Sequence, residues 1–433
     1  MMTKAIKKKD IYSTIQYLVI LFIILDCNSV YRAAYFNFGI PEICAILIGL
    51  LLITNVWLYG LNIRILKLWG KIFVPYYFAM LLFLFVNVPA ESIFAFLVRF
   101  FIVLPVLSYV LCIDKYKGDQ YSLLLKISSV MTLLALLSIL FWVFGPQLHI
   151  LRPNMSISAY WGGSYTYQGY FGLLFERQYS DFYGTRIYRN QSIFAEGPMY
   201  SLCLVFALCI EVFFKSSISK NKFRIGEISF GKKISRRNGR IILLIASILS
   251  TTTTTGIILI VVVFTLSFLR QKPRDQIIKI LKFLGSVVAV VICAFISYNL
   301  FAEKSTSHSW SVRYLDFVYG FTAWKYSPIF GTGYGDFMKA NLVAGVTKQG
   351  FSNSIMAVLS QGGIVLFAVY IIPFITGGMV AVKDKNSGLI LFLIIALLEF
   401  IFTLFPYTFL LLFILALFYA ETIVTRSESN KSK

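Results

Sequence analysis

Long apolar segments recur along almost the whole chain, and they constrain its fold more than any other feature. A bilayer core of about 30 Å needs about 20 apolar residues in a helix that crosses it. Segments of about that length follow one another with short polar stretches between most of them. They cover residues 11–28, 41–60, 72–89, 92–113, 124–145, 192–214, 241–269, 283–302, 353–379, 387–404 and 407–424.

The composition agrees with a membrane protein. Of 433 residues, 58% are hydrophobic and only 14% are charged, and the mean hydropathy is +0.78. A soluble domain of this size would carry more charge. We therefore expect an all-α, polytopic integral membrane protein in the cytoplasmic membrane, with residues 1–433 forming a single membrane domain of about 12 transmembrane helices.

The positive charges indicate an orientation. If the N-terminus is cytoplasmic, 29 of the 40 Lys and Arg residues fall in cytoplasmic segments and ten in external ones, with Arg99 inside a span. This bias follows the positive-inside rule. It explains the net charge of +21 without a nucleic-acid partner. It predicts cytoplasmic termini, a basic cytoplasmic loop at 215–240, where contact with membrane lipids is possible, and two long external loops at 146–191 and 303–352.

The segment 241–269 has basic residues on both flanks, so both flanks are expected in the cytoplasm. A helix of that length would extend about 43 Å, too long for one crossing and too short for two. Two short helices meeting at the threonine-rich stretch 250–256 fit best, and a single tilted helix is the alternative. Counting this hairpin as two gives the 12 helices.

The first external loop ends in a charged stretch before the span at 192–214. Arg186 and Arg189 would share one face of a helical turn, and two guanidinium groups on one face suit a phosphate or pyrophosphate. Glu196 is either their salt-bridge partner or a base acting on a sugar hydroxyl. The many aromatic residues of this loop, Tyr188 among them, suit either the bilayer interface or a glycan groove.

The second external loop supplies another anion-binding candidate, Arg313, next to Tyr314. His308 is either a general acid–base group or a polar loop residue. Gly331, Gly333 and Gly335 follow no predicted strand, so a turn is expected there and not a nucleotide-binding loop.

Two further features concern the protein interior. Arg99, within a span, should face the protein interior. Six cysteines without metal-ligand spacing and only two histidines argue against a metal site.

These residues resemble bacterial O-antigen and capsular polysaccharide polymerases of the Wzy type and their relatives, the O-antigen ligases. The resemblance covers roughly residues 186–365. The motifs that carry it are Arg186 followed after ten residues by Gly197, the sequence Phe194-Ala-Glu196-Gly-Pro198, the turn at Thr255-Gly256, and Arg313 followed by the glycines 331–335, Ser352-Asn353 and Gly362-Gly363. Two departures stand out: after ten intervening residues Arg313 is followed by Trp324 where glycine is expected, and Ser352-Asn353 replaces a histidine found in ligases.

The resemblance implies a GT-C-type membrane glycosyltransferase that needs no metal, cofactor or nucleotide sugar. Its substrates would be undecaprenyl-pyrophosphate-linked glycans, joined at the outer face of the cytoplasmic membrane, with a chain-length regulator and a flippase as partners. Arg186, Arg189 and Arg313 would stabilise the pyrophosphate leaving group, with Glu196 as the base. Tyr188, Gly197, Tyr314, His308, Asn353 and Arg99 would contact substrate.

Other classes remain open from the sequence alone. An O-antigen ligase-like transferase would share the motifs. A lipid-linked oligosaccharide flippase would share the span count and the internal arginines, although the two long charged external loops favour the transferase. A channel or a structural membrane protein is the least specific alternative.

Overall fold

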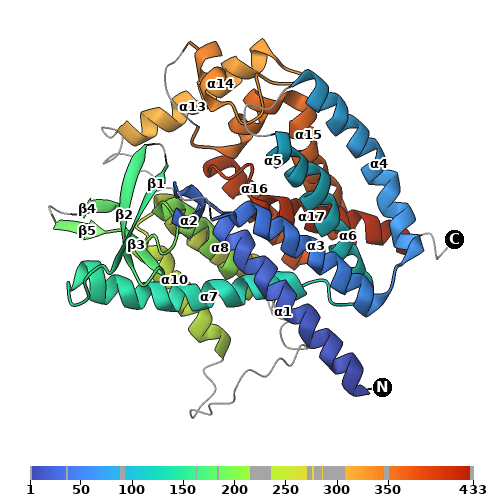
Figure 1. The fold of residues 1–433 in the computed structure, drawn as a ribbon, viewed down its shortest axis with the longest axis horizontal. Coiled ribbons are helices and arrows are strands. Elements are labelled where there is room, and N and C mark those ends of the chain that lie inside the picture. The colour runs from blue at the N-terminus through green and yellow to red at the C-terminus, as the bar shows by residue number, and fades with distance from the viewer. Residues whose placement is uncertain are drawn as a thin grey trace.

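The computed structural model describes residues 2–35, 38–87, 93–161, 163–182, 185–214, 236–270, 276, 285, 308–345 and 351–429. It is mostly helical (Figure 1). The helical elements, with η marking a π-helical turn, are α1 (Met2–Asp26), α2 (Val30–Ala33), α3 (Ile40–Tyr59), α4 (Ile63–Val86), α5 (Ile93–Leu97), η1 (Val98–Val103), α6 (Leu104–Tyr116), α7 (Ser122–Trp142), η2 (Val143–Gln147), α8 (Gly197–Phe213), α10 (Arg236–Ser250), α11 (Thr254–Arg270), α13 (His308–Tyr326), α14 (Phe337–Val343), α15 (Ser354–Lys383), α16 (Ser387–Phe402) and α17 (Phe409–Ser429).

Six helical stretches in the described part are long and apolar enough to cross a membrane: 40–59, 63–86, 93–116, 122–147, 354–383 and 409–427. The helices α8, α11 and α16 are apolar but shorter. Nearly all of the predicted span at 283–302 and most of the loop at 215–240 lie outside the described residues. The described residues are mostly helical and consistent with the expected membrane protein, whereas the count of 12 and the side of each terminus stay predictions.

The helices differ in how deeply they are buried. Nearly every side chain of α8 is buried, and most of α17 is too. In contrast, α4 exposes Phe78 and Phe85, the latter to 84%. Large apolar side chains exposed on an outer helix are expected where lipid replaces water as the solvent. The cysteines among the described residues are free and buried: Cys27, Cys44, Cys112, Cys203 and Cys209.

The predicted hairpin at 241–269 is confirmed. Helix α10 ends at Ser250, α11 starts at Thr254, and the three residues between them form a turn. Thr252 adopts a φ of 50° in this turn. Its neighbour Thr253 donates a 2.9 Å hydrogen bond to Ser201 Oγ on α8. Contacts such as this satisfy polar groups at a turn that is buried in protein.

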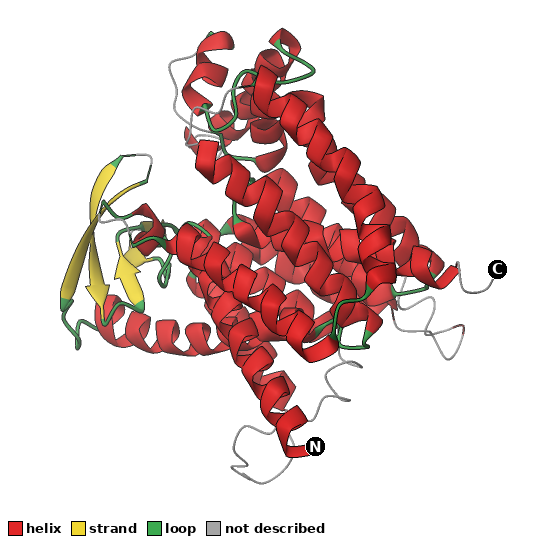
Figure 2. Ribbon diagram, turned by 45° about the vertical axis from the view of Figure 1, so that its right-hand side comes forward, coloured by secondary structure: helices red, strands yellow, loops and turns green. Residues whose placement is uncertain are grey.

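The first predicted external loop contains strands, which the all-α prediction did not include. β1 (Met155–Tyr160), β2 (Ser164–Tyr170) and β3 (Leu174–Glu176) form an antiparallel sheet in that order. β4 (Tyr179–Phe182) and β5 (Thr185–Tyr188) form a separate hairpin. Residues there alternate between serine or threonine and larger side chains, and this period of two fits a half-exposed strand. Figure 2 shows the strands beside the helices, away from both chain ends.

The glycines 331–335 form a turn, as predicted. The segment that contains this turn forms hydrogen bonds with the backbone of α15 at a kink. Gly363 has φ 58° and ψ −162°, so α15 kinks there. The amides of Thr332 and Ile364 donate to the carbonyls of Ser360 and Pro328 at 2.8 and 2.9 Å. The kinked backbone is therefore hydrogen-bonded to the glycine turn, as a buried break requires.

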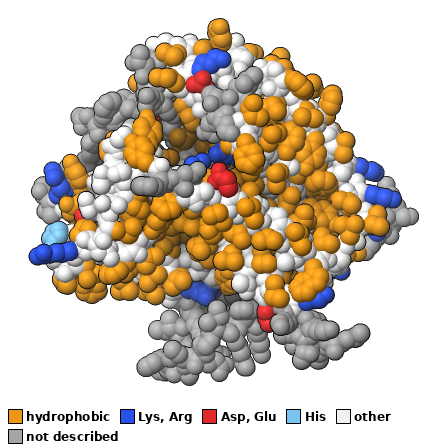
Figure 3. Space-filling model, viewed as in Figure 1, with side chains coloured by type: hydrophobic (Ala, Val, Ile, Leu, Met, Phe, Trp, Pro, Cys, Tyr) orange, Lys and Arg blue, Asp and Glu red, His pale blue; other side chains and the backbone are white. Residues whose placement is uncertain are grey.

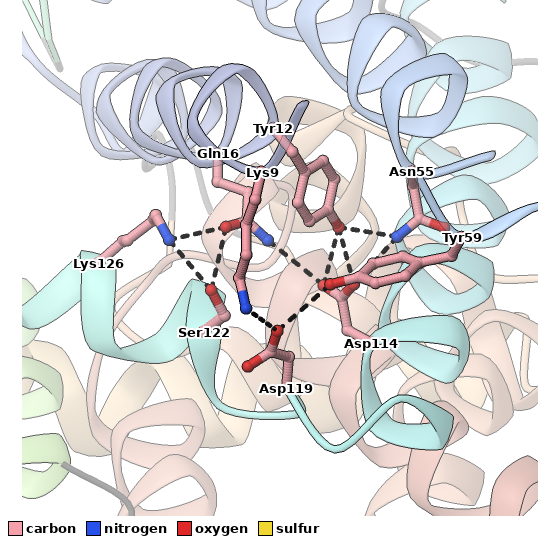
Figure 4. A network of polar contacts seen from close by, with 9 residues as sticks. All are labelled: Lys9, Tyr12, Gln16, Asn55, Tyr59, Asp114, Asp119, Ser122 and Lys126. Carbon is pink, nitrogen blue, oxygen red and sulfur yellow. Dashed lines mark hydrogen bonds and ion pairs between the residues drawn. The ribbon is translucent and has the colours of Figure 1, made fainter. Parts of the chain in front are cut away.

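A buried polar network joins α1, α3, α6 and α7 close to where α6 ends (Figure 4). The carboxylate of Asp114 accepts hydrogen bonds from Tyr12 at 2.8 and 2.9 Å and from Asn55 at 3.0 Å. Gln16 accepts a 2.7 Å hydrogen bond from the buried ammonium of Lys126. Buried polar groups are tolerated only when they are paired, so this network fixes how the four helices pack.

Asp114→Ala should lower the free energy of unfolding by about 2–4 kcal/mol, because it leaves buried donors on Tyr12 and Asn55 without their acceptor. Asp114→Asn keeps one acceptor oxygen and should cost less. Thermal unfolding of the purified protein in detergent would measure both. Asp384→Ala, at an exposed helix end, is the matched control and should leave the midpoint nearly unchanged; an equal loss in both alanine variants would refute the role of the network.

Candidate functional site

A cavity of about 370 Å³ lies where the strands meet the helices. Two arginines, Arg32 and Arg99, line it together with Asp26, and Tyr160 and Trp161 supply aromatic walls. In the space-filling view, basic side chains are visible in a hollow between the strands and the helices (Figure 3). The volume is typical of a small-molecule site, and convergent polar groups among aromatic walls make such a cavity a binding-site candidate.

Arg99 comes from η1, a π-helical turn of the kind often found at functional sites. The side chain is 6% exposed, so it faces the interior as predicted. Its Nη1 donates a 3.0 Å hydrogen bond to the hydroxyl of Tyr334. The amide of Tyr334 donates to Asn87 at the end of α4, at 2.8 Å. The glycine turn thus holds the residue that orients Arg99.

Arg32 lies on α2, close to the end of α1. Its Nε is 3.4 Å from Asp26 Oδ1, and the other carboxylate oxygen accepts a 2.9 Å hydrogen bond from the amide of Phe409 at the start of α17. Two guanidinium groups and one carboxylate leave the polar lining of the cavity with an excess of positive charge. Arginine is the side chain best suited to bind a phosphate with two parallel hydrogen bonds.

A second cluster forms around Arg189, just after β5. Its Nε donates a 3.0 Å hydrogen bond to the carbonyl of Thr251 in the α10–α11 turn, and its amide donates to the carbonyl of Gln178 at 2.9 Å. The side chain of Gln178 accepts from the amide of Gly197 at 3.1 Å. Burial lowers the pKa of the Arg189 guanidinium, and the nearby Glu196 carboxylate opposes that shift. The structure therefore brings Arg189, Glu196 and Gly197 into one cluster.

The predicted pairing of Arg186 with Arg189 on one helical face is wrong. Arg186 lies on β5, opposite Asp181 of β4, and its guanidinium carbon is 4.1 Å from the ring centre of Tyr179. Side chains alternate along a strand, so positions three apart point to opposite faces. The sequence analysis did not predict these strands, because the partner of a strand cannot be identified from local sequence.

The other predicted residues are spread over three elements. The backbone carbonyl of Tyr188 accepts hydrogen bonds from Trp142 and Gln147 at 2.8 and 3.0 Å. Asn353 caps α15 through a 2.8 Å bond from the amide of Met356. Tyr314 is exposed on α13. His308 and Arg313 belong to the same helix, but their side chains lie outside the described part of the chain.

The two clusters adjoin each other through the backbone. The amide of Ala195 donates to the carbonyl of Asn28, which lines the cavity, and Val30 pairs with Ile193 at 2.8 Å. Arg32 and Asp26 were missed by the sequence interpretation; a charged pair six residues apart at the end of a predicted span was the available signal.

Within the described residues, no group of three or more His, Cys, Asp or Glu side chains could hold a metal ion.

Residues 240–371 match a family model described as O-antigen ligase. This stretch includes α11, α13, the glycine turn, Tyr334 and the kink of α15. It is consistent with the O-antigen ligase/polymerase superfamily, and it includes the threonine-rich turn at 250–256 that the predicted resemblance contains. A comparison with curated proteins gives no match.

Proposed function

We propose that this chain, whose residues 240–371 match the family model described as O-antigen ligase, is a polysaccharide polymerase. It would join undecaprenyl-pyrophosphate-linked repeat units at the outer face of the cytoplasmic membrane, in the synthesis of a capsule, an exopolysaccharide or an O-antigen. The observation that carries this proposal is the cavity, because it combines arginines for a diphosphate with aromatic walls for sugars. Tyr334, within the matched stretch, bonds directly to Arg99.

The reaction follows from this arrangement. A hydroxyl of the acceptor sugar attacks the anomeric carbon of the donor, and the bond from that carbon to the diphosphate oxygen breaks with inversion. Negative charge develops on the departing diphosphate. Preorganised cations in a site shielded from water stabilise such charge strongly. Arg99 and Arg32 would serve this role inside the cavity, with Arg189 and Arg313 binding the diphosphate of the second lipid-linked substrate.

The acceptor hydroxyl must also lose a proton. We propose Glu196 as its acceptor, because this carboxylate belongs to the second cluster, next to Gly197, whose amide is held by Gln178. Glu196 is half-buried beside Arg189 at the start of α8. The general-base role requires a carboxylate within hydrogen-bond reach of the hydroxyl. Arg186, Tyr188 and Tyr314 would contact the glycan.

A ligase that transfers finished glycan to another acceptor is the second candidate, favoured by the description of the matching family. Ser352 and Asn353 stand where the resemblance places a histidine in ligases, which favours the polymerase. His308 is a further proposed substrate contact, and Asn353 would act by fixing the start of α15.

Glycan length in a deletion strain tests the proposal. For a polymerase, deletion should leave single lipid-linked repeat units at the outer face, and the wild-type gene should restore a ladder of chain lengths. Accumulation of full-length polymer still attached to its lipid would identify a ligase. Repeat units trapped on the cytoplasmic face would identify a flippase and refute both transferase proposals.

A further inference from the structure

The outer face of β1 and β2 carries an unusual set of side chains. Three cross-strand pairs are exposed there: Ser156 with Gln168, Ser158 with Thr166, and Tyr160 with Ser164. Each pair presents hydroxyl or amide groups. The opposite face packs into a small core through Ala159 and Tyr167. The alternation therefore turns a row of uncharged hydrogen-bonding groups outward.

Neither strand contains a charged residue, although the chain has 59 of them. An ordinary solvated sheet face usually carries charged side chains, because these keep a surface soluble. A lipid headgroup surface would require cations. A protein interface would require an apolar centre. The chemistry of this face matches none of these, but it matches the neutral hydroxyl groups of a sugar chain.

The row leads directly to the cavity. Tyr160, at the end of β1, lines the cavity together with Trp161 and is also 52% exposed. Tyr35, 58% exposed, reaches across the same end of the sheet, where its hydroxyl pairs with Ser164 Oγ. Flat rings with a polar tip combine apolar contact with hydrogen bonding. From Ser156 to Tyr160 the strand extends roughly 14 Å, long enough to contact more than one sugar ring.

We propose that this face, made of Ser156, Ser158, Tyr160, Ser164, Thr166 and Gln168, binds the oligosaccharide chain as it extends from the cavity. This inference rests on the proposed function, since it names where the glycan of the lipid-linked substrate lies. Arginines in the cavity would hold the diphosphate end, and the hydroxyl row would hold the sugars. The affinity of this face for the glycan, which keeps the chain bound between additions of repeat units, would then determine the length of the polymer.

The test uses two double variants of the full-length protein purified in detergent. Ser158→Val/Thr166→Val and Ser156→Val/Gln168→Val each remove one pair of polar groups while keeping residues that favour strands. The probe is the lipid-free oligosaccharide released by mild acid from the lipid carrier of the deletion strain. We expect about tenfold weaker binding in each variant, because two hydrogen bonds to sugar are lost. Thr54→Val on α3 makes the same chemical change elsewhere and should bind normally.

In cells, both variants should shift the ladder to shorter chains at normal protein abundance. Unchanged affinity and an unchanged ladder in either stable variant would overturn the glycan-binding face. If thermal unfolding shows that one double variant is poorly folded, the other double variant tests the glycan-binding face. A deletion strain that still makes a full ladder would refute the proposed function instead, and the binding measurement with purified protein separates the two failures.

Discussion

Cells that carry Arg99→Ala should lose the glycan ladder and accumulate single lipid-linked repeat units. Removing one preorganised group that stabilises developing charge typically lowers a rate by about 10²- to 10³-fold. Arg99 is suited to that role because it is buried, lines the cavity and is held by Tyr334 at 3.0 Å. Lipid-linked glycans would be extracted and their lengths compared at equal membrane abundance of the protein.

Three further variants make this measurement decisive. Arg99→Lys keeps the charge but loses the planar fork of donors, so a partial ladder is expected. Tyr334→Phe removes only the hydroxyl that orients Arg99 and should reduce the rate about tenfold. Arg64→Ala deletes an arginine that instead bonds the carbonyl of Ser427 at 2.7 Å, and it should leave the ladder intact. A full ladder in Arg99→Ala would exclude the cavity as the diphosphate site.

Gly331→Ala should destabilise the protein by about 2–5 kcal/mol. Gly331 has φ +75°, which costs any residue with a Cβ about 1–2 kcal/mol. A Cβ there would also lie 2.3 Å from the carbonyl carbon and oxygen of Gln361. Backbone atoms cannot move aside as a flexible side chain can, and such overpacking typically adds about 1–3 kcal/mol. Thermal unfolding in detergent would report the loss.

Gly345 provides a matched control for the clash. Its φ is +77°, but no atom lies within 4 Å of an added Cβ. Gly345→Ala should therefore lose only about 1–2 kcal/mol, the cost of the backbone conformation alone. Equal losses at Gly331 and Gly345 would show that the turn and α15 are not packed as closely as described.

Local and periodic features were predictable from the sequence. The hairpin of α10 and α11 followed from a length unsuited to one crossing and from basic residues on both flanks. The turn at Gly331 followed from glycine spacing. The strands were missed, although Ser156 to Tyr160 and Ser164 to Tyr170 alternate with a period of two around a glycine-containing turn. That pattern is a hairpin signal, but it is weak beside the long apolar segments.

The cavity could not be predicted because it depends on contacts between distant residues. Arg99 and Tyr334 are 235 residues apart. Arg32 becomes part of the site only because α1 ends beside the start of α17, where Asp26 meets Phe409. Arg189, in contrast, was predicted from its place before an apolar run, and the structure puts it beside Glu196. Its assumed helical alignment with Arg186 failed because pairing between strands is not encoded in local spacing.

The contacts at the tip of the α10–α11 hairpin also bear on the order in which the chain is made. Asn190 bonds Ser250 through both backbone and side chain, Arg189 bonds Thr251, and Ser180 pairs with Thr252. The ribosome synthesises residue 250 some 60 residues after Asn190. During translation, the segment from β4 to α8 cannot complete these hydrogen bonds until residues 250–252 have been synthesised. Formation of the hairpin is therefore also a folding step for the strand region, and a chain truncated before residue 250 would lack the partners that complete the hydrogen bonds of that region.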